Sequence, residues 1–131
     1  MYRDSQPQPV PAKPLRWVGA AYRELVGFTD EARRAAGYNL KLVQQGVMPE
    51  DWKPMEAVGL GTYELRIATG ASGSVQHRVL YVAKFEEAVY VLHAFEKKAR
   101  TTPQHDLEIG RARYAEMLRI RRERSRSSEG R

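Results

Sequence analysis

Apolar residues between positions 29 and 47 recur three or four positions apart, which predicts an amphipathic helix with one face toward a core. The residues on that face are Ala32, Ala36, Leu40, Val43 and Val47. Thr29 is expected to cap the N-terminus, because its side-chain oxygen can accept a backbone hydrogen bond and acidic residues follow at once. Gly46 and Pro49 end the helix.

Two shorter elements are predicted before this helix. Residues 15–18 form a β-like run, and residues 20–28 are predicted to be a short helix. We expect that helix to turn Tyr22 and Leu25, with Val26 beside them, toward the core.

From position 59 the period of the pattern falls to two, which is typical of strands. Within residues 61–69 apolar side chains alternate with polar or small ones, so one face of the strand is apolar and the other can face water. The apolar face carries Tyr63, Leu65 and Ile67, and the wet face carries Glu64 and Arg66.

A turn rich in glycine and serine follows at 70–73, and residues 75–83 return as a strand of β-branched and aromatic residues. These two strands are predicted to form a hairpin, with Arg78 on its wet face. Residues 89–95 are predicted to be a third strand of the same meander.

The last predicted helix begins at Thr102 and Pro103, a hydroxyl cap followed by a proline in the first turn. Its apolar stripe is Leu107, Gly110, Tyr114 and Met117 or Leu118. The predicted order is therefore β-α-α-β-β-β-α. Strands that cluster after two helices favour an α+β domain with a small, mainly antiparallel sheet and helices packed on one face.

The length of 131 residues suits a single domain, which we predict over residues 15–120. Residues 1–14 carry four prolines among polar residues and are predicted to be a flexible leader. Residues 121–131 are rich in arginine and serine and are predicted to be a basic disordered tail.

Composition narrows the class of protein. The chain is 42% hydrophobic and 29% charged, without an apolar run near the ~20 residues of a membrane helix. It has no cysteine and no apolar core of a signal peptide, which together favour the cytoplasm. The net charge is +6, and residues 111–131 carry eight arginines against three glutamates. Such a basic pole attracts polyanions, commonly nucleic acid; the alternative is a solvated helix face.

The histidines are dispersed, and no metal-ligand spacing or nucleotide-binding glycine motif occurs, so no metal site and no cofactor are predicted. A set of cations on or just after the strands stands out instead. They are Arg66, Arg78, Lys97, Lys98 and Arg100, with His93 and Tyr81 nearby in sequence. Fixed cations can stabilise the negative charge that develops on a phosphodiester during cleavage. Arginine can also hold a phosphate with two parallel hydrogen bonds.

Each of these residues also has a purely structural explanation. Arg66 can form a surface ion pair with Glu64 on the same strand face. His93 can be a neutral, hydrogen-bonded histidine within the sheet. The cations from Lys97 onward can be solvated loop residues. Residue spacing alone does not decide between these readings and catalysis.

Seven short segments add a further pattern. They are RWVG at 16–19, GYNLKLVQQG at 37–46, KPM at 53–55, VGLGTYELR at 58–66, HRVLYV at 77–82, VLHAFEKK at 91–98 and TTP at 101–103. Together and in this order they resemble the phage-derived branch of the RelE/ParE toxin superfamily, which is grouped with HigB-type toxins. The resemblance implies a RelE-like fold, with a small mainly antiparallel sheet, two N-terminal helices and a variable C-terminal helix.

The resemblance also implies a metal-independent endoribonuclease that cuts mRNA on the ribosome, where the 2′-hydroxyl attacks the adjacent phosphorus. By position, Arg78 matches the sheet arginine that grips the scissile phosphate. Lys97, Lys98 and Arg100 fall where RelE-type toxins carry cationic catalytic residues, and Arg66 matches a recurrent arginine beside them.

Which group takes the proton stays open between His93 and a lysine. Arg111 and Arg113 of the basic C-terminal segment join Arg66 and Arg100 as candidates for binding RNA phosphates. The partners that this interpretation implies are a helix-turn-helix antitoxin and mRNA on the ribosome, with no membrane. The alternatives are a non-enzymatic phage regulatory or nucleic-acid-binding module of the same fold, and a gyrase inhibitor of the ParE kind.

Overall fold

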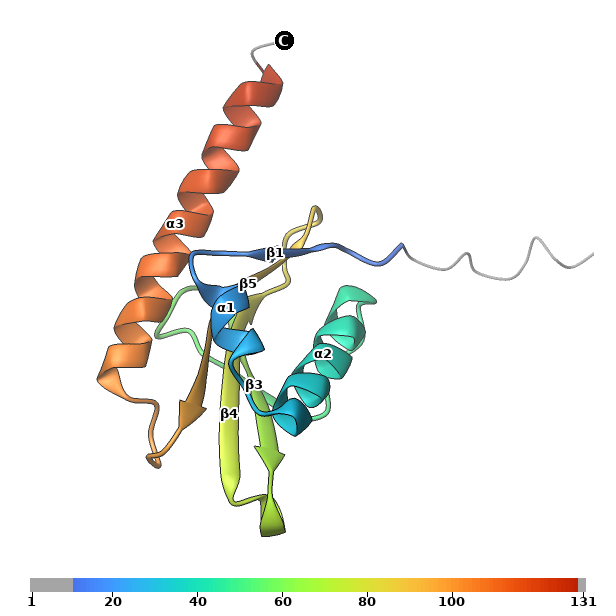
Figure 1. The fold of residues 1–131 in the computed structure, drawn as a ribbon. Helices are drawn as coiled ribbons and strands as arrows, with labels where there is room; N and C mark the ends of the chain where they lie inside the picture. The colour runs from blue at the N-terminus through green and yellow to red at the C-terminus, as the bar shows by residue number, and fades with distance from the viewer. Residues whose placement is uncertain (1–10, 130–131) are drawn as a thin grey trace, which may run out of the picture.

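The computed structural model describes residues 11–129, so most of the predicted leader, residues 1–10, and the last two residues lie outside it. In sequence order the described residues form β1 (Leu15–Trp17), α1 (Ala21–Val26), α2 (Asp30–Gln44), β2 (Trp52–Pro54), β3 (Thr62–Thr69), the short 3₁₀ helix η2 (Ala71–Gly73), β4 (Val75–Val82), β5 (Val89–Lys97) and α3 (Gln104–Glu129) (Figure 1). Each predicted helix and strand is present. β2 is an additional strand, because its three residues are too few to show a period of two.

The strands form one mixed sheet in the order β1-β5-β4-β3-β2. Neighbours from β2 to β5 pair antiparallel, whereas β1 runs parallel to β5, with Leu15 opposite Val89 and Trp17 opposite Val91. The α+β class is therefore confirmed. The sheet is mixed because two helices and three strands separate β1 from β5, which leaves room for a parallel crossover.

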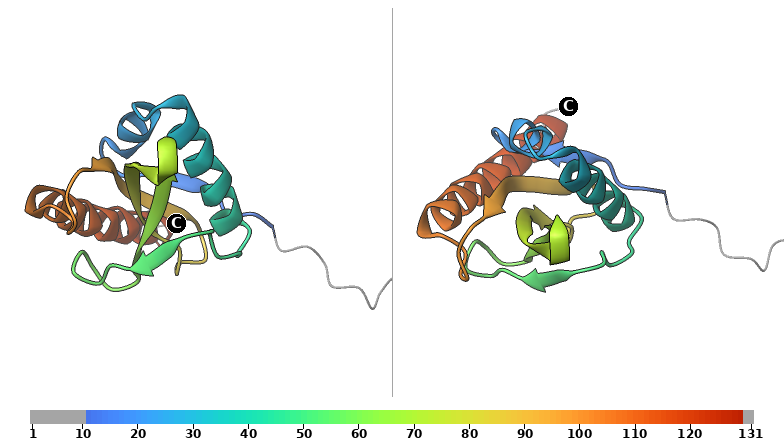
Figure 2. Two further views of the ribbon diagram at one scale, coloured as in Figure 1. Left: turned by 90° about the horizontal axis from the view of Figure 1, so that it is seen from below. Right: turned by 60° about the horizontal axis from the view of Figure 1, so that its bottom comes forward.

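Helices cover both faces of this sheet, which corrects the prediction that they pack on one face (Figure 1 and Figure 2). α1 and α2 lie on the face that carries Val79 and Tyr81 of β4. α3 lies on the opposite face, which carries Leu80 and Val82. The reason is visible in the sequence of β4, where apolar residues follow one another without alternation, as in strands buried on both faces.

The longer N-terminal helix, α2, follows its predicted pattern closely. Thr29 caps it, its side-chain oxygen accepting a hydrogen bond from the backbone N–H of Ala32 at 3.3 Å. The apolar stripe is buried as far as Val43. The predicted last member of the stripe, Val47, lies beyond the end of the helix and is 51% exposed.

The shorter helix, α1, buries less than predicted. Leu25 is buried together with Ala21, which lies one turn before it. Tyr22 and Val26, which we expected to face the core, are 58% and 41% exposed. A helix of six residues presents only a narrow stripe to the sheet, and Ala21 and Leu25 already occupy it.

α3 packs closely on the second face at Gly110. A Cβ atom added there would lie 2.9 Å from Cδ1 of Leu80 and 3.1 Å from Cγ2 of Val58. Met117, two turns further along, is fully buried in the same cluster. The predicted stripe of this helix, which includes Gly110 and Met117, therefore forms its contact with the sheet.

The C-terminal half of α3 continues to Glu129, through positions where the sequence predicted a disordered tail from residue 121. Arg121 forms an ion pair with Glu87, with Nε 2.6 Å from Oε2, and its guanidinium carbon lies 3.5 Å from the centre of the Phe85 ring. These contacts hold the helix beyond its apolar stripe. Within residues 11–129, neither α3 nor any other helix combines the length and the apolar character needed to cross a membrane.

Two helical glycines test the packing of α3. Gly37 of α2 has open space around its position, so Gly37→Ala should stabilise the fold by about 0.5–1 kcal/mol through helix propensity. Gly110→Ala gains the same propensity but presses on Leu80 and Val58, and overpacking costs about 1–3 kcal/mol. We therefore expect urea unfolding to find Gly110→Ala less stable than Gly37→Ala by about that cost. Equal stabilisation of both variants would contradict the close packing.

Candidate functional site

β5 contains a bulge that shapes the first of two charge clusters. Leu80 of β4 pairs with His93, but the next residue of β4, Tyr81, pairs with Val91, so Leu92 is an extra residue in β5. β1 ends opposite Val91. Within residues 11–129, no strand therefore lies beside the edge of β5 beyond that point.

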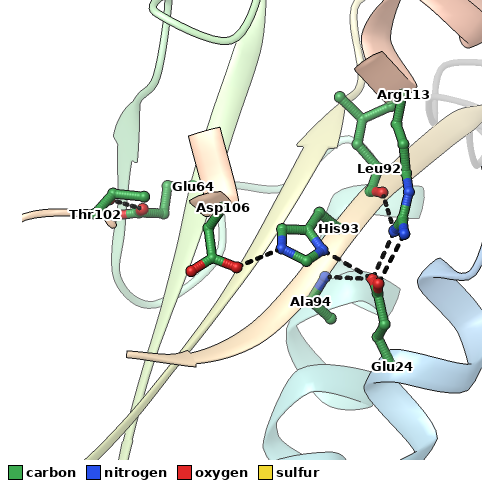
Figure 3. A network of polar contacts seen from close by, with 8 residues as sticks. All are labelled: Glu24, Glu64, Leu92, His93, Ala94, Thr102, Asp106 and Arg113. Atoms are coloured by element: carbon green, nitrogen blue, oxygen red, sulfur yellow. Dashed lines mark hydrogen bonds and ion pairs between the residues drawn. The ribbon is translucent and has the colours of Figure 1, made fainter. Parts of the chain in front are cut away.

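Side chains from two helices bond to this edge. The backbone N–H of Ala94 donates to Oε1 of Glu24 at 3.2 Å, and the carbonyl of Leu92 accepts from Nη1 of Arg113 at 3.0 Å (Figure 3). Glu24 belongs to α1 and Arg113 to α3. Side chains from the two flanking helices thus provide hydrogen-bond partners for the backbone groups at this edge of β5.

The His93 cluster, which we define as Glu24, His93, Asp106 and Arg113, completes this junction. His93 is 4% exposed, with Nδ1 2.9 Å from Oε1 of Glu24 and Nε2 2.7 Å from Oδ1 of Asp106 (Figure 3). Arg113 also holds Glu24 with two hydrogen bonds, of 2.6 and 2.8 Å.

The side chains of the His93 cluster bond to one another. Burial by itself raises the pKa of Glu24, but hydrogen bonds from Arg113 and His93 outweigh it and leave that pKa below its ordinary value. Both ring nitrogens of His93 and both terminal nitrogens of Arg113 are engaged in internal contacts. The predicted catalytic histidine and the predicted phosphate-binding Arg113 therefore join α1, β5 and α3.

The second cluster lies on the same face of the sheet as α3 and is built around Glu64 and Arg78. Both were expected on a wet face, and both are buried, at 0% and 3% exposure. The prediction was wrong because the segment before α3 covers this face: Thr102 donates its hydroxyl hydrogen bond to Oε2 of Glu64 at 3.1 Å. The hydroxyl that was predicted to cap α3 is used here instead.

Arg78 is held from several sides. Its Nε lies 3.4 Å from Oε1 of Glu64, and its Nη1 donates to Oε1 of Gln76 at 2.9 Å and to the carbonyl of His77 at 3.0 Å. Burial lowers the pKa of the Arg78 guanidinium, against the opposing effect of Glu64.

Three further cations surround this ion pair. Lys53 of β2 has its Nζ 3.8 Å from Oε1 of Glu64. Lys97 is the last residue of β5 and lies opposite Gln76; burial and then the charge of Arg78 lower its pKa. Arg66 lies opposite Arg78 in the sheet and pairs with Asp51 at 3.9 Å, rather than with Glu64 as the structural reading predicted.

We call this set, Lys53, Glu64, Arg66, Arg78 and Lys97, the Arg78 cluster. Its four cations are accompanied by the carboxylates of Glu64 and Asp51, so positive charge is in excess. Among the described side chains, Oε1 of Glu64 and Nε of Arg78 are buried polar atoms without a hydrogen-bond partner. These two atoms form the 3.4 Å ion pair without hydrogen-bond geometry, so the Nε–H of Arg78 is a donor without an acceptor. The excess of positive charge and this free donor give the cluster the character of an anion site.

The other predicted site residues lie apart from both clusters. Lys98 and Arg100 are exposed in the segment after β5, and no described contact links them to Arg78. Arg111 is exposed on α3 and donates to the carbonyl of Ala57 at 2.8 Å. Within residues 11–127, no three His, Asp or Glu side chains gather in a way that could hold a metal ion.

Sequence reasoning missed Lys53, Glu24 and Asp106. Lys53 was present in a matched segment but had no strand pattern around it. Glu24 and Asp106 reach His93 across 69 and 13 residues of chain, and no local spacing indicates such contacts. Glu64 did carry a signal, since it shares a strand face with Arg66 and lies opposite Leu80, two residue pairs from Arg78.

The fold and the Arg78 cluster define a small α+β protein compatible with a toxin-like module that has an anion-attracting face. The family model described as phage derived protein Gp49-like (DUF891) matches residues 23–115. The chain belongs to this family, which is part of the RelE/toxin-like superfamily. No curated protein matches the sequence. The matched residues include both clusters and end within α3.

Acid unfolding tests the role of Glu24. Because its pKa is lowered, ionised Glu24 contributes stability above the ordinary value of 4.5, and the contribution is lost as pH falls through the lower folded value. We expect the free energy of unfolding to fall more steeply below pH 4.5 in the parent than in Glu24→Gln, which has no charge to lose. Urea unfolding at several pH values measures this difference.

The control is Glu56→Gln at an exposed position, which should keep the parent's pH profile. Parallel profiles for the parent and Glu24→Gln would argue against the junction described above.

Proposed function

We propose that the protein is the toxin of a type II toxin–antitoxin pair, of the HigB-like branch, and that it cleaves mRNA on the ribosome without a metal ion. Its partner in this proposal is a helix-turn-helix antitoxin, and its setting is the cytoplasm. The observation that carries the proposal is the excess of positive charge in the Arg78 cluster, together with the buried Nε–H of Arg78, which has no hydrogen-bond acceptor.

The chemistry requires only groups of the RNA and of the protein. The 2′-hydroxyl oxygen forms a bond to the adjacent phosphorus, the bond from phosphorus to the 5′ oxygen breaks, and a 2′,3′-cyclic phosphate and a 5′-hydroxyl result. A base takes the proton of the 2′-hydroxyl, and an acid returns a proton to the leaving oxygen. Negative charge grows on the phosphorane between these steps, and the guanidinium of Arg78 is suited to stabilise it.

We assign proton transfer to Lys97. Its lowered pKa gives a larger neutral fraction near neutral pH than an ordinary lysine has. It lies at the end of β5 and is only partly buried, so it remains accessible. His93 is less suited, because both of its ring nitrogens already contact carboxylates.

Access to Arg78 requires a movement of the chain. Arg78 and Glu64 are almost fully buried, and Thr102, in the segment between β5 and α3, bonds to Glu64. A phosphate therefore reaches Arg78 only when that segment moves aside. The same burial favours a second candidate function, a module of this fold that binds nucleic acid through exposed arginines without cutting it.

Expression without an antitoxin is expected to arrest growth and to create new transcript 5′ ends within translated reading frames. The matched control is Lys97→Ala, which should leave growth and transcripts unchanged. Growth curves with 5′-end mapping, in the presence and absence of a translation inhibitor, measure the effect and its dependence on the ribosome. Normal growth of the parent without new 5′ ends would favour the non-cleaving module.

Variants of two neighbouring lysines distinguish proton transfer by Lys97 from a general effect of positive charge on the cleavage rate. With purified translating ribosomes, Lys97→Ala should slow cleavage by about 10²-fold or more, because a positioned acid or base contributes roughly 10²–10⁴ in rate. Lys97→Arg should not restore the rate, because a guanidinium keeps its proton. Lys98→Ala, at the exposed neighbouring position, should cleave like the parent.

All three variants should melt like the parent, since lysines at a strand end add little to folding. A parent-like cleavage rate for Lys97→Ala would remove Lys97 from the site. A parent-like cleavage rate for Lys97→Arg would show that residue 97 acts through its positive charge and not by proton transfer.

A further inference from the structure

The C-terminal half of α3 extends past the sheet (Figure 1). Its residues 117–129 hold five arginines and two glutamates, which is half of the chain's net charge of +6. It lies beyond residue 115, where the family match ends. Two of its arginines are engaged: Arg119 pairs with Glu116 and Glu123, and Arg121 pairs with Glu87. Three others remain, and they are Arg122, Arg124 and Arg126.

These three arginines face solvent. All are exposed, and no carboxylate among the described side chains pairs with them. Arg122 and Arg126 are four residues apart and Arg124 lies between them, so the three span about 6 Å of helix axis. Arg122 and Arg126 lie on one side of the helix, and Arg124 lies on the side that turns toward Arg16. No carboxylate among the described side chains compensates their charge.

A fourth arginine comes from the opposite end of the sequence. Arg16 of β1 and Arg124 line the same surface hollow of about 330 Å³ between β1 and α3, together with Tyr90 and Glu87. Nη1 of Arg16 lies 3.4 Å from the hydroxyl of Tyr90, which donates to Oε2 of Glu87 at 2.8 Å. The hollow is therefore built by side chains that contact one another.

The carboxylate in this hollow, Glu87, is already paired with a cation. Arg121 and Tyr90 both bond to Glu87, and these hydrogen bonds lower the pKa of Glu87 to about 2 despite its partial burial. Glu87 is therefore ionised at neutral pH and forms its ion pair with Arg121. Arg16 and Arg124 remain available to an external anion.

We propose that Arg16, Arg122, Arg124 and Arg126, which we call the α3 basic surface, bind the phosphate backbone of RNA as a second contact, separate from the Arg78 cluster. That the nucleic acid is RNA rests on the proposed function. A guanidinium suits this task, because it can hold a phosphate with two parallel hydrogen bonds. Several neighbouring arginines bind a backbone without reading its sequence.

The chemistry of the surface favours nucleic acid over an acidic protein. After Ile120, α3 has no apolar residue, since its sequence continues RRERSRSSE. A protein interface needs apolar or aromatic anchors at its centre, whereas phosphate contacts need only cations and polar groups.

The distance along α3 separates this surface from the Arg78 cluster. Thr102, which bonds to Glu64, lies just before the first turn of α3. Arg124 lies some twenty residues further, which corresponds to about 30 Å of helix. The α3 basic surface therefore contacts another stretch of RNA than the nucleotides at the Arg78 cluster, and it adds to binding without taking part in bond breaking.

The test compares two triple variants that remove the same charge. One is Arg122→Gln, Arg124→Gln, Arg126→Gln on the proposed surface. The control is Arg23→Gln, Arg34→Gln, Lys41→Gln, whose parent residues are exposed on α1 and α2. Glutamine keeps the helix propensity of arginine and lysine, so both variants should fold, and melting temperatures check this.

The probe is a fluorescent single-stranded 2′-O-methyl RNA of about 20 nucleotides, titrated at several salt concentrations. It has no 2′-hydroxyl and is not cleaved, so its binding is independent of whether the protein is a nuclease. We expect the α3 variant to lose about 2 units from the slope of log K against log salt, at roughly 0.7 per charge for a single strand, and roughly 100-fold in affinity near 0.1 M salt. The control variant should bind like the parent.

Three results would overturn the proposal. The first is a parent-like slope and affinity in the α3 variant. The second is an equal loss in the control variant, which would reflect net charge alone. The third is displacement of the RNA by a polyglutamate peptide of equal charge at a lower concentration than unlabelled RNA needs, which would identify an acidic protein as the partner.

Discussion

The edge of β5 is the constraint on which the arrangement of the helices depends. β1 pairs with residues 89–91 of β5, and the bulge at Leu92 follows directly after the end of this pairing. A buried strand edge must find other hydrogen-bond partners. Glu24 and Arg113 provide them from helices on opposite faces of the sheet, and they bond to each other. Satisfying one edge therefore fixes both α1 and α3 on the sheet.

The two charge clusters bury charge in opposite ways, and this decides which one we assign to function. In the His93 cluster two carboxylates meet a guanidinium and a histidine ring at 2.6–2.9 Å. In the Arg78 cluster the ion pairs are longer, at 3.4–3.9 Å, and cations outnumber carboxylates. Breaking a buried pair costs about 3–5 kcal/mol of a total stability of about 5–15 kcal/mol, so an incompletely satisfied cluster carries a real energetic cost. Proteins tolerate such costs mainly at functional sites.

The sequence pattern predicted α1, α2, α3 and every strand except β2. The longer helices and strands among them show their period, whereas β1 was predicted from a short β-like run alone. The pattern did not predict which faces are covered. Glu64 alternates with apolar residues as on a wet face, but it is buried, and Thr102, which is distant in sequence, bonds to it. The candidate cations of the hairpin were predictable, because Arg66 and Arg78 lie opposite each other in its register.

The remaining members of the clusters were not predictable for a different reason. His93 was identified as either a sheet histidine or a catalytic one, and both readings depend on what surrounds the ring. Its partners Glu24 and Asp106 come from α1 and α3, so only the tertiary structure brings the three together. The exposed position of Lys98 likewise follows from where β5 ends, which the sequence predicted two residues too early.

α3 combines two properties that would be separate in a helix followed by a disordered tail. Gly110 and Met117 bind it to the sheet, while the contacts of Arg121 with Glu87 and Phe85 hold the part that follows. A disordered basic segment loses conformational freedom when it binds, and that loss reduces its affinity. An anchored helix has already lost that freedom on folding. Its arginines are therefore presented in a fixed arrangement beside Arg16, at a set distance from the Arg78 cluster, so a ligand that meets both surfaces must match that spacing.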